Sequence, residues 1–176
     1  MYRERMEKLK EWKVSKNRKP LIIRGARQVG KTWLMKEFGK LYYEKFAYIN
    51  FDNNSRMDIL FNEEFDLDRI IQGLKIESGI NIEPENTLII FDEIQETPNA
   101  LKALKYFYEN ANEYHIVAAG SLLGVAIHQG TSFPVGKVNF MDLMPLSFFE
   151  FLDALGQEHL LNLLKNNEFD MISVFN

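Results

Sequence analysis

Two patterns of apolar residues alternate along most of the chain, and each predicts a different element. Apolar runs of about four to eight residues predict buried strands, whereas apolar residues three and four positions apart predict helices with one buried face. The predicted strands are 21–25, 46–52, 87–94, 115–121 and 136–143. The predicted helices are 2–13, 31–43, a helix from about 66 to 74, a helix from 98 to about 108, and a last helix after residue 147.

Residues at the ends of several segments support these helices. Asp66 is an N-cap type, and Pro98 suits the first position of a helix. Ser147 with Glu150 three residues later predicts a capping box. Strands that alternate with helices predict an α/β fold in which a parallel sheet is covered on both faces, with ligands bound at the carboxyl ends of the strands.

The first helix has a sparse apolar stripe. Met6, Leu9 and Trp12 are spaced to face the same side of it, so we expect this helix to lie against the core.

Composition narrows the class of protein. The 176 residues are 46% hydrophobic, which is enough for one core, so we expect a single domain over 1–176. The sequence has no cysteine, which excludes disulfides and thiolate metal sites. His115, His128 and His159 lack metal-ligand or nucleophile spacing, and we interpret them as structural or surface residues.

No targeting or membrane segment is visible. The charged N-terminus lacks the apolar core of a signal peptide, and the longest mainly apolar stretch, 116–127, is too short to cross a bilayer. We therefore expect a cytoplasmic protein.

Charge is distributed unevenly. The net charge is −4, but residues 1–31 hold eleven Lys and Arg against three Asp and Glu, which leaves ten against twenty-two in the rest. A basic leader is able to attract nucleic acid. Because the body is acidic and charged helix faces are usually only solvated, we expect no useful DNA affinity from the leader alone.

The stretch GARQVGKTW, residues 25–33, follows the first predicted strand and opens a helix. It fits G-x-x-x-x-G-K-[ST], the pattern of a phosphate-binding P-loop, in the context that the pattern requires. Glycines let the loop turn backbone N–H groups toward phosphate, the lysine supplies a charge, and the threonine hydroxyl suits Mg²⁺. The predicted nucleotide-binding residues are Gly25, Ala26, Arg27, Gln28, Val29, Gly30, Lys31, Thr32 and Trp33.

Two acids close the buried run TLIIFDEI. Because adjacent strand residues point to opposite faces, Asp92 is expected to reach Mg²⁺ while Glu93 is aimed at an attacking water beside the γ-phosphate. Ser121 ends the fourth predicted strand, and its hydroxyl suits either the same water or a simple turn.

The stretches GARQVGKT, LIIFDEIQ, AAGSLLG and SFPVGKVNFMDLMPLSFFEFL together resemble one family, over about residues 5–155. This family is the prokaryotic AAA-type ATPases whose ATPase core is followed by a C-terminal domain of uncharacterised function. The resemblance implies a three-layer P-loop NTPase with sheet order 5-1-4-3-2 and ATP as the nucleotide. It also implies Lys31 at phosphate, Thr32 and Asp92 at Mg²⁺, Glu93 as catalytic base and Ser121 as the polar sensor residue.

Two departures from the family pattern limit the resemblance. Many relatives carry arginine where this chain has Lys137, which weakens any inferred bidentate phosphate contact there. Family members also continue past the final MISVFN, so we expect a fragment that lacks the helical lid, the second sensor arginine and the C-terminal domain.

The sequence thus predicts an Mg-dependent ATPase, with two alternatives. One is an ATP-dependent switch, or a DNA-associated regulatory module, that moves a protein partner or the absent domain with negligible turnover. The other is a small-molecule phosphotransferase, which usually needs an arginine-bearing lid, and no arginine follows Arg69.

Overall fold

A five-stranded sheet forms the centre of the molecule. The computed structural model describes residues 4–62, 65–120, 134 and 136–166. The strands are β1 (Leu21–Arg24), β2 (Lys45–Asn50), β3 (Thr87–Asp92), β4 (His115–Gly120) and β5 (Asn139–Asp142). All neighbouring pairs are parallel and the order is β2-β3-β4-β1-β5, which confirms the expected α/β class and the order 5-1-4-3-2.

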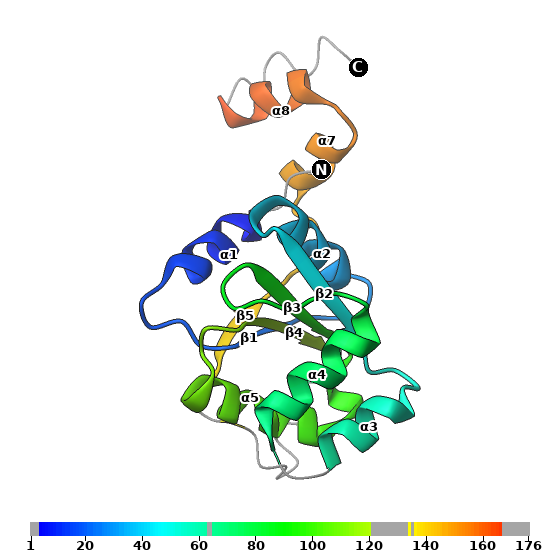
Figure 1. The fold of residues 1–176 in the computed structure, drawn as a ribbon. Helices are drawn as coiled ribbons and strands as arrows, with labels where there is room; N and C mark the ends of the chain where they lie inside the picture. Colours follow the sequence, from blue (N-terminus) through cyan, green and yellow to red (C-terminus); the bar gives the residue numbers. More distant parts are fainter. Residues whose placement is uncertain (1–3, 63–64, 121–133, 135, 167–176) are drawn as a thin grey trace.

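Helices cover both faces of this sheet, which gives three layers (Figure 1). One face carries α1 (Arg5–Val14) and α2 (Lys31–Tyr42). The other carries α3 (Ser55–Asn62), α4 (Leu67–Ser78) and α5 (Pro98–Asn110).

Alternation along the strands divides the core into two clusters. Leu21 and Ile23 of β1 pack toward α1 and α2, whereas Ile22 packs toward α3, α4 and α5. The other inner strands follow the same rule, because successive side chains point to opposite faces. Both faces are therefore apolar, which explains why the strands read as continuous apolar runs.

The predicted helix ends are largely confirmed. Asp66 accepts hydrogen bonds from the backbone N–H groups of Asp68 and Arg69, and Pro98 begins α5. Ser147 and Glu150 form the capping box at the start of α7 (Phe148–Ala154). The apolar stripe of α1 is also confirmed, because its three members are buried against the core.

Several boundaries and two helices differ from the prediction. The strand expected over 87–94 ends at Asp92, and Ile94–Glu96 form a short 3₁₀ helix, η1. Helices α3 and α8 (Glu158–Lys165) were not predicted, so α7 is not the last helix. Both missed helices are short, with eight residues each.

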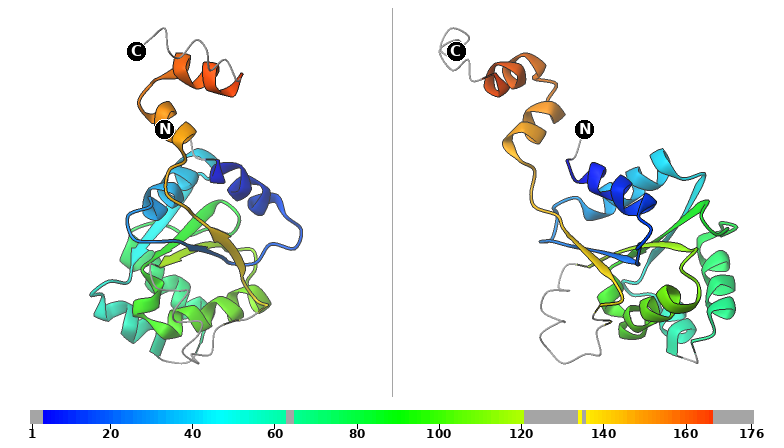
Figure 2. Two further views of the ribbon diagram at one scale, coloured as in Figure 1. Left: turned by 180° about the vertical axis from the view of Figure 1, so that it is seen from behind. Right: turned by 90° about the vertical axis from the view of Figure 1, so that its left-hand side faces the viewer.

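The pair α7 and α8 extends away from the three layers (Figures 1 and 2). A hydrogen bond between Glu4 and Glu150 joins it to the body, in which Glu4 N donates to Glu150 Oε1 over 2.9 Å. None of the helices within the described residues is long and apolar enough to cross a membrane.

Candidate functional site

The loop after β1 lies at the carboxyl edge of the sheet and leads directly into α2. Gly30 is the N-cap of α2 and has φ 90°, a left-handed conformation that favours glycine. No side chain of the described residues caps this helix, and its first N–H groups point toward an anion site at the helix N-terminus.

Gly25 is required for a different reason from the one that the motif suggests. A Cβ placed there would lie 2.3 Å from the carbonyl oxygen of Leu143 and 3.2 Å from Cγ2 of Val29. Leu143 follows β5, and its N–H donates to Arg24 O over 2.7 Å. Glycine at this position therefore lets the end of β5 approach the loop.

Lys31 is buried beneath the loop, with 6% of its surface exposed. Its Nζ donates to the carbonyl oxygens of Gly25 over 2.9 Å and Ala26 over 2.7 Å. Burial lowers the pKa of Lys31, and the nearby charges of Glu93 and Asp92 oppose that shift. The lysine is thus held at the loop by backbone acceptors that phosphate oxygens are able to replace.

Asp92 is buried at the end of β3 and accepts three hydrogen bonds. Thr32 Oγ1 donates to its Oδ2 over 2.7 Å, and the Tyr48 hydroxyl donates to the same oxygen over 3.0 Å. The backbone N–H of Glu93 donates to Oδ1 over 3.2 Å. Burial, and then the charge of Asp92, raises the pKa of Tyr48, so the phenol stays protonated and acts as a donor.

Glu93 leaves the strand through a left-handed backbone conformation, with φ 51° and ψ 42°. The separation of the two neighbouring acids therefore comes from this turn and not from strand alternation, which corrects the geometry expected from the sequence. Gln95 Nε2 donates to Glu93 Oε2 over 2.7 Å and to Glu96 Oε1 over 3.1 Å. The amide of Gln95 thus bridges two carboxylates of the same turn.

A pocket of about 640 Å³ opens over these groups. It is lined by Arg27, Gln28, Gly30, Lys31, Thr32, Trp33, Asp52, Glu93, Gln95 and Glu96. Of the predicted nucleotide-binding residues, Gly25, Ala26 and Val29 are not among those lining it, and the Val29 side chain is buried in the core. Trp33 remains 36% exposed at the pocket.

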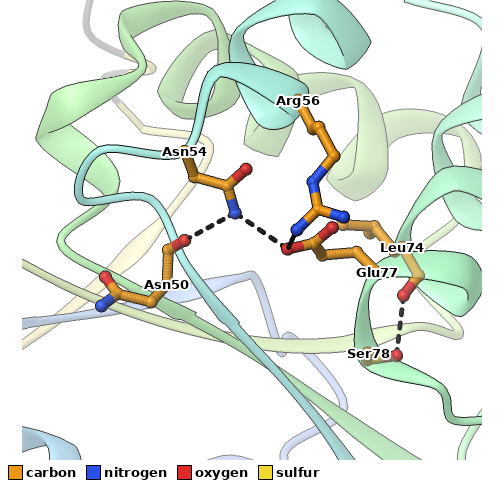
Figure 3. Close-up of polar contacts among 6 residues, drawn as sticks. All are labelled: Asn50, Asn54, Arg56, Leu74, Glu77 and Ser78. Atoms are coloured by element: carbon orange, nitrogen blue, oxygen red, sulfur yellow. Dashed lines mark hydrogen bonds and ion pairs between the residues drawn. The ribbon is translucent and has the colours of Figure 1, made fainter.

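Asp52 enters the pocket from the loop after β2 and was not among the predicted site residues. The loop is tied to α4, because the Asn54 amide donates to Asn50 O over 3.0 Å and to Glu77 Oε1 over 2.9 Å (Figure 3). Arg56 donates to the same Glu77 oxygen over 3.2 Å. Asp52 closes the predicted strand 46–52, so the argument applied to Asp92 could have found it.

Tyr48, Gln95 and Glu96 were also missed. Tyr48 carries no motif signal, because its contact with Asp92 exists only once β2 and β3 pair. Gln95 and Glu96 follow the acidic pair directly, but their place in the pocket depends on the turn at Glu93.

The sequence also singled out Ser121, His128 and Lys137. Ser121 and His128 fall outside the described residues. Lys137 precedes β5, at the amino edge of the sheet, where it forms an ion pair with Glu109 over 2.9 Å. In this structure it is therefore not at the phosphate-binding loop.

The residues present fit a magnesium ion bound together with a nucleotide. Thr32 and Asp92 supply oxygen atoms, the ligand type that Mg²⁺ prefers, and Mg²⁺ takes its remaining ligands from phosphate and water. Within the described ranges no group of three or more His, Cys, Asp or Glu could hold a metal alone.

Most of the chain matches a known protein family. Residues 17–152 match the profile of a family described as an AAA domain. No curated protein matches the sequence significantly.

Among solved structures, a Walker-type ATPase of Pyrococcus abyssi is 17% identical, with a TM-score of 0.56 over 88% of this chain and 58% of that one. Drosophila ORC bound to DNA is 17% identical, with a TM-score of 0.58 over 86% and 45%. The Aeropyrum pernix ORC1 protein in complex with DNA is 14% identical, with a TM-score of 0.51 over 90% and 50%. The chain thus spans about half of these relatives, and the likeness shows a shared P-loop NTPase fold.

Proposed function

Because the chain belongs to the AAA-domain family, we propose that it binds ATP with Mg²⁺ and hydrolyses the terminal phosphate. The observation that carries the proposal is the meeting of three elements at one pocket. The start of α2 brings Lys31 and Thr32, and the end of β3 brings Asp92 within 2.7 Å of the Thr32 hydroxyl. The turn after β3 adds Glu93 to the pocket.

Each residue has a separate role in the proposed reaction. The loop N–H groups and Lys31 bind the phosphates, and Thr32 and Asp92 hold Mg²⁺, which neutralises charge on the phosphate oxygens. Glu93 accepts a proton from a water whose oxygen attacks the γ-phosphorus, while the bond to the β-phosphate oxygen breaks to release ADP and phosphate. Ser121 is proposed as a second polar group beside this water.

The charge of the chain does not favour binding of nucleic acid, although two of the similar structures contain DNA. Among the basic residues of 1–31, Lys10 forms an ion pair with Glu7 and Arg24 forms one with Asp142. These pairs compensate the two positive charges, which reduces their attraction for a phosphate backbone. The rest of the chain is acidic and repels that backbone.

Substitution of the two neighbouring acids tests the proposal. We expect Glu93→Gln to preserve Mg·ATP binding but slow hydrolysis by about 10² to 10⁴, because the proton acceptor is lost. Asp92→Asn should weaken the affinity for Mg²⁺. Lys31→Ala should abolish ATP binding without unfolding the protein. Calorimetry measures binding, and phosphate release measures turnover.

Glu85→Gln is a matched control. Glu85 also has positive φ, 62°, but precedes β3 at the opposite edge of the sheet, so its variant should behave as wild type. Equal hydrolysis by wild type and Glu93→Gln would contradict the mechanism. Tight Mg·ATP binding without phosphate release from wild type would favour the switch alternative.

A further inference from the structure

Tyr48 contacts the proposed metal-binding carboxylate from a strand that no nucleotide-binding motif includes. It lies on β2, at the edge of the sheet, and its hydroxyl donates to Asp92 Oδ2 over 3.0 Å. Asp92 is only 4% exposed, so its charge depends on donors from the protein. Two of these donors, Thr32 and Tyr48, bind the same oxygen.

The two hydroxyl donors differ in what else they do. Thr32 opens α2 at the phosphate-binding loop and lines the pocket, so its oxygen is the one offered to Mg²⁺. Tyr48 does not line that pocket. Its hydrogen bond would therefore still orient Asp92 when the Thr32 hydroxyl turns from this carboxylate to Mg²⁺.

A cation strengthens the phenol as a donor. Lys36 Nζ lies 3.5 Å from the centroid of the Tyr48 ring. Lys36 is four residues after Thr32 on α2, so one helix supplies both the competing donor to Asp92 and the cation over the second donor. A cation on the ring face draws electron density from the phenol and makes its O–H a better donor.

We propose that Tyr48 is a positioning residue that holds the Asp92 carboxylate for Mg²⁺, and that it thereby sets how much Mg²⁺ increases ATP affinity. The inference rests on the proposed function of the pocket. It adds β2 to the elements that build the metal site, through a residue outside the lining of the pocket.

Tyr43 provides a matched control within the same chain. Its hydroxyl also makes a partly buried side-chain hydrogen bond, with His115 Nδ1 over 2.7 Å, and Lys13 Nζ lies 4.1 Å from its ring centroid. His115 begins β4, so this contact is at the amino edge of the sheet, away from the pocket. Tyr43→Phe therefore removes a comparable hydroxyl without touching Asp92.

The experiment measures ATP affinity by calorimetry in Mg²⁺ and in EDTA for wild type, Tyr48→Phe and Tyr43→Phe. We expect Tyr48→Phe to reduce the Mg²⁺-dependent gain in affinity about tenfold, since a hydrogen bond to a charged group is lost, and to leave affinity in EDTA unchanged. Tyr43→Phe should keep the wild-type gain. Thermal melting verifies that each variant is folded at the temperature of the titration.

Lys36→Gln keeps the phenol and gives a second test if Tyr48→Phe is too unstable. We expect Lys36→Gln to reduce the Mg²⁺-dependent gain in ATP affinity about two- to threefold. The double variant should show the same gain as Tyr48→Phe alone, because Lys36 acts through the phenol.

An unchanged gain in Tyr48→Phe would overturn the role of Tyr48 while leaving the proposed function intact. Equal weakening in Mg²⁺ and EDTA would also overturn it, because the hydroxyl would then support the pocket as a whole. Absence of Mg·ATP binding by wild type would instead contradict the proposed function itself.

Discussion

Glu93 adopts a backbone conformation that is unfavourable for a glutamate. Left-handed φ and ψ cost a non-glycine residue about 1 to 2 kcal/mol, and Glu93 has φ 51° and ψ 42°. The hydrogen bond from Gln95 fixes the side chain in the same turn. Strain of this kind persists where the surrounding structure fixes the residue, and it is frequent at functional sites.

This conformation makes stability depend on which residue replaces Glu93. Glu93→Gly should be more stable than Glu93→Ala by about 1 kcal/mol, because only glycine adopts this conformation without cost. Both variants lose the carboxylate equally, so their difference isolates the backbone effect. Urea unfolding measures the free energies, and phosphate release should be slowed in both.

Glu85 again serves as the control. The same pair of substitutions at Glu85 should show glycine more stable than alanine, with hydrolysis retained, because φ is positive there too. If Glu93→Gly were no more stable than Glu93→Ala, the turn would not be strained.

Individual residues of the site were predictable where local sequence determines their position. Gly30, Lys31 and Thr32 lie within one loop and helix start, so spacing alone predicts their arrangement. Tyr48 reaches Asp92 from another strand, so its role depends on strand pairing. Gly25 was predicted as part of the motif, but its requirement comes from Leu143, a residue distant in the sequence.

Among the elements, those with clear helical periodicity, a continuous apolar run or a capping box were predictable. The five strands and helices α1, α2, α4, α5 and α7 follow such patterns. The end of β3 was not predictable, because apolar Ile94 follows the two acids and extends the predicted strand. The backbone already turns at Glu93. Helix α3 was missed although Met57 and Phe61 have helical spacing, since three turn-forming residues precede it.

The capping residue of α7 also joins this helix to the body. Glu150 Oε2 accepts from Ser147 N, and Oε1 accepts from Glu4 N, just before α1 begins. Glu150 is buried although it is an acid, and these two donors help to compensate its charge. The same side chain therefore stabilises the start of α7 and fixes it to α1.

Substitution separates these two roles. Glu150→Ala should speed amide exchange about fivefold both in the first turn of α7 and at Glu4, because both N–H groups lose an acceptor. Ser147→Ala removes the cap but keeps Glu150, so only α7 should exchange faster. Hydrogen exchange followed by mass spectrometry distinguishes the two segments, and unchanged exchange at Glu4 in Glu150→Ala would show that the link contributes little.

Helix α1 packs on the central sheet beside His115, the first residue of β4. His115 is buried there, with the Tyr43 hydroxyl 2.7 Å from its Nδ1 and the Trp12 ring against its edge. Burial, and then the positive charges of Arg18 and Lys13, lowers the pKa of His115 to about 4. The folded protein thus holds this imidazole neutral at neutral pH.

This histidine makes global stability depend on pH. Its pKa is about 4 in the folded protein, against the ordinary value of 6.5 in an unfolded chain, so between these values the unfolded chain binds more protons. Its contribution is fully present above pH 6.5 and decreases as pH falls, by about 3 kcal/mol on reaching pH 4. His115→Gln keeps an acceptor for Tyr43 but does not titrate.

Urea unfolding of wild type and His115→Gln between about pH 7.5 and 4.5 checks this prediction, because carboxylates that titrate in both proteins cancel in the difference. Wild type should lose stability relative to the variant as pH falls. A constant difference across this range would show that folding does not lower the pKa of His115, and that protonation of this imidazole does not destabilise the packing of α1 on the sheet.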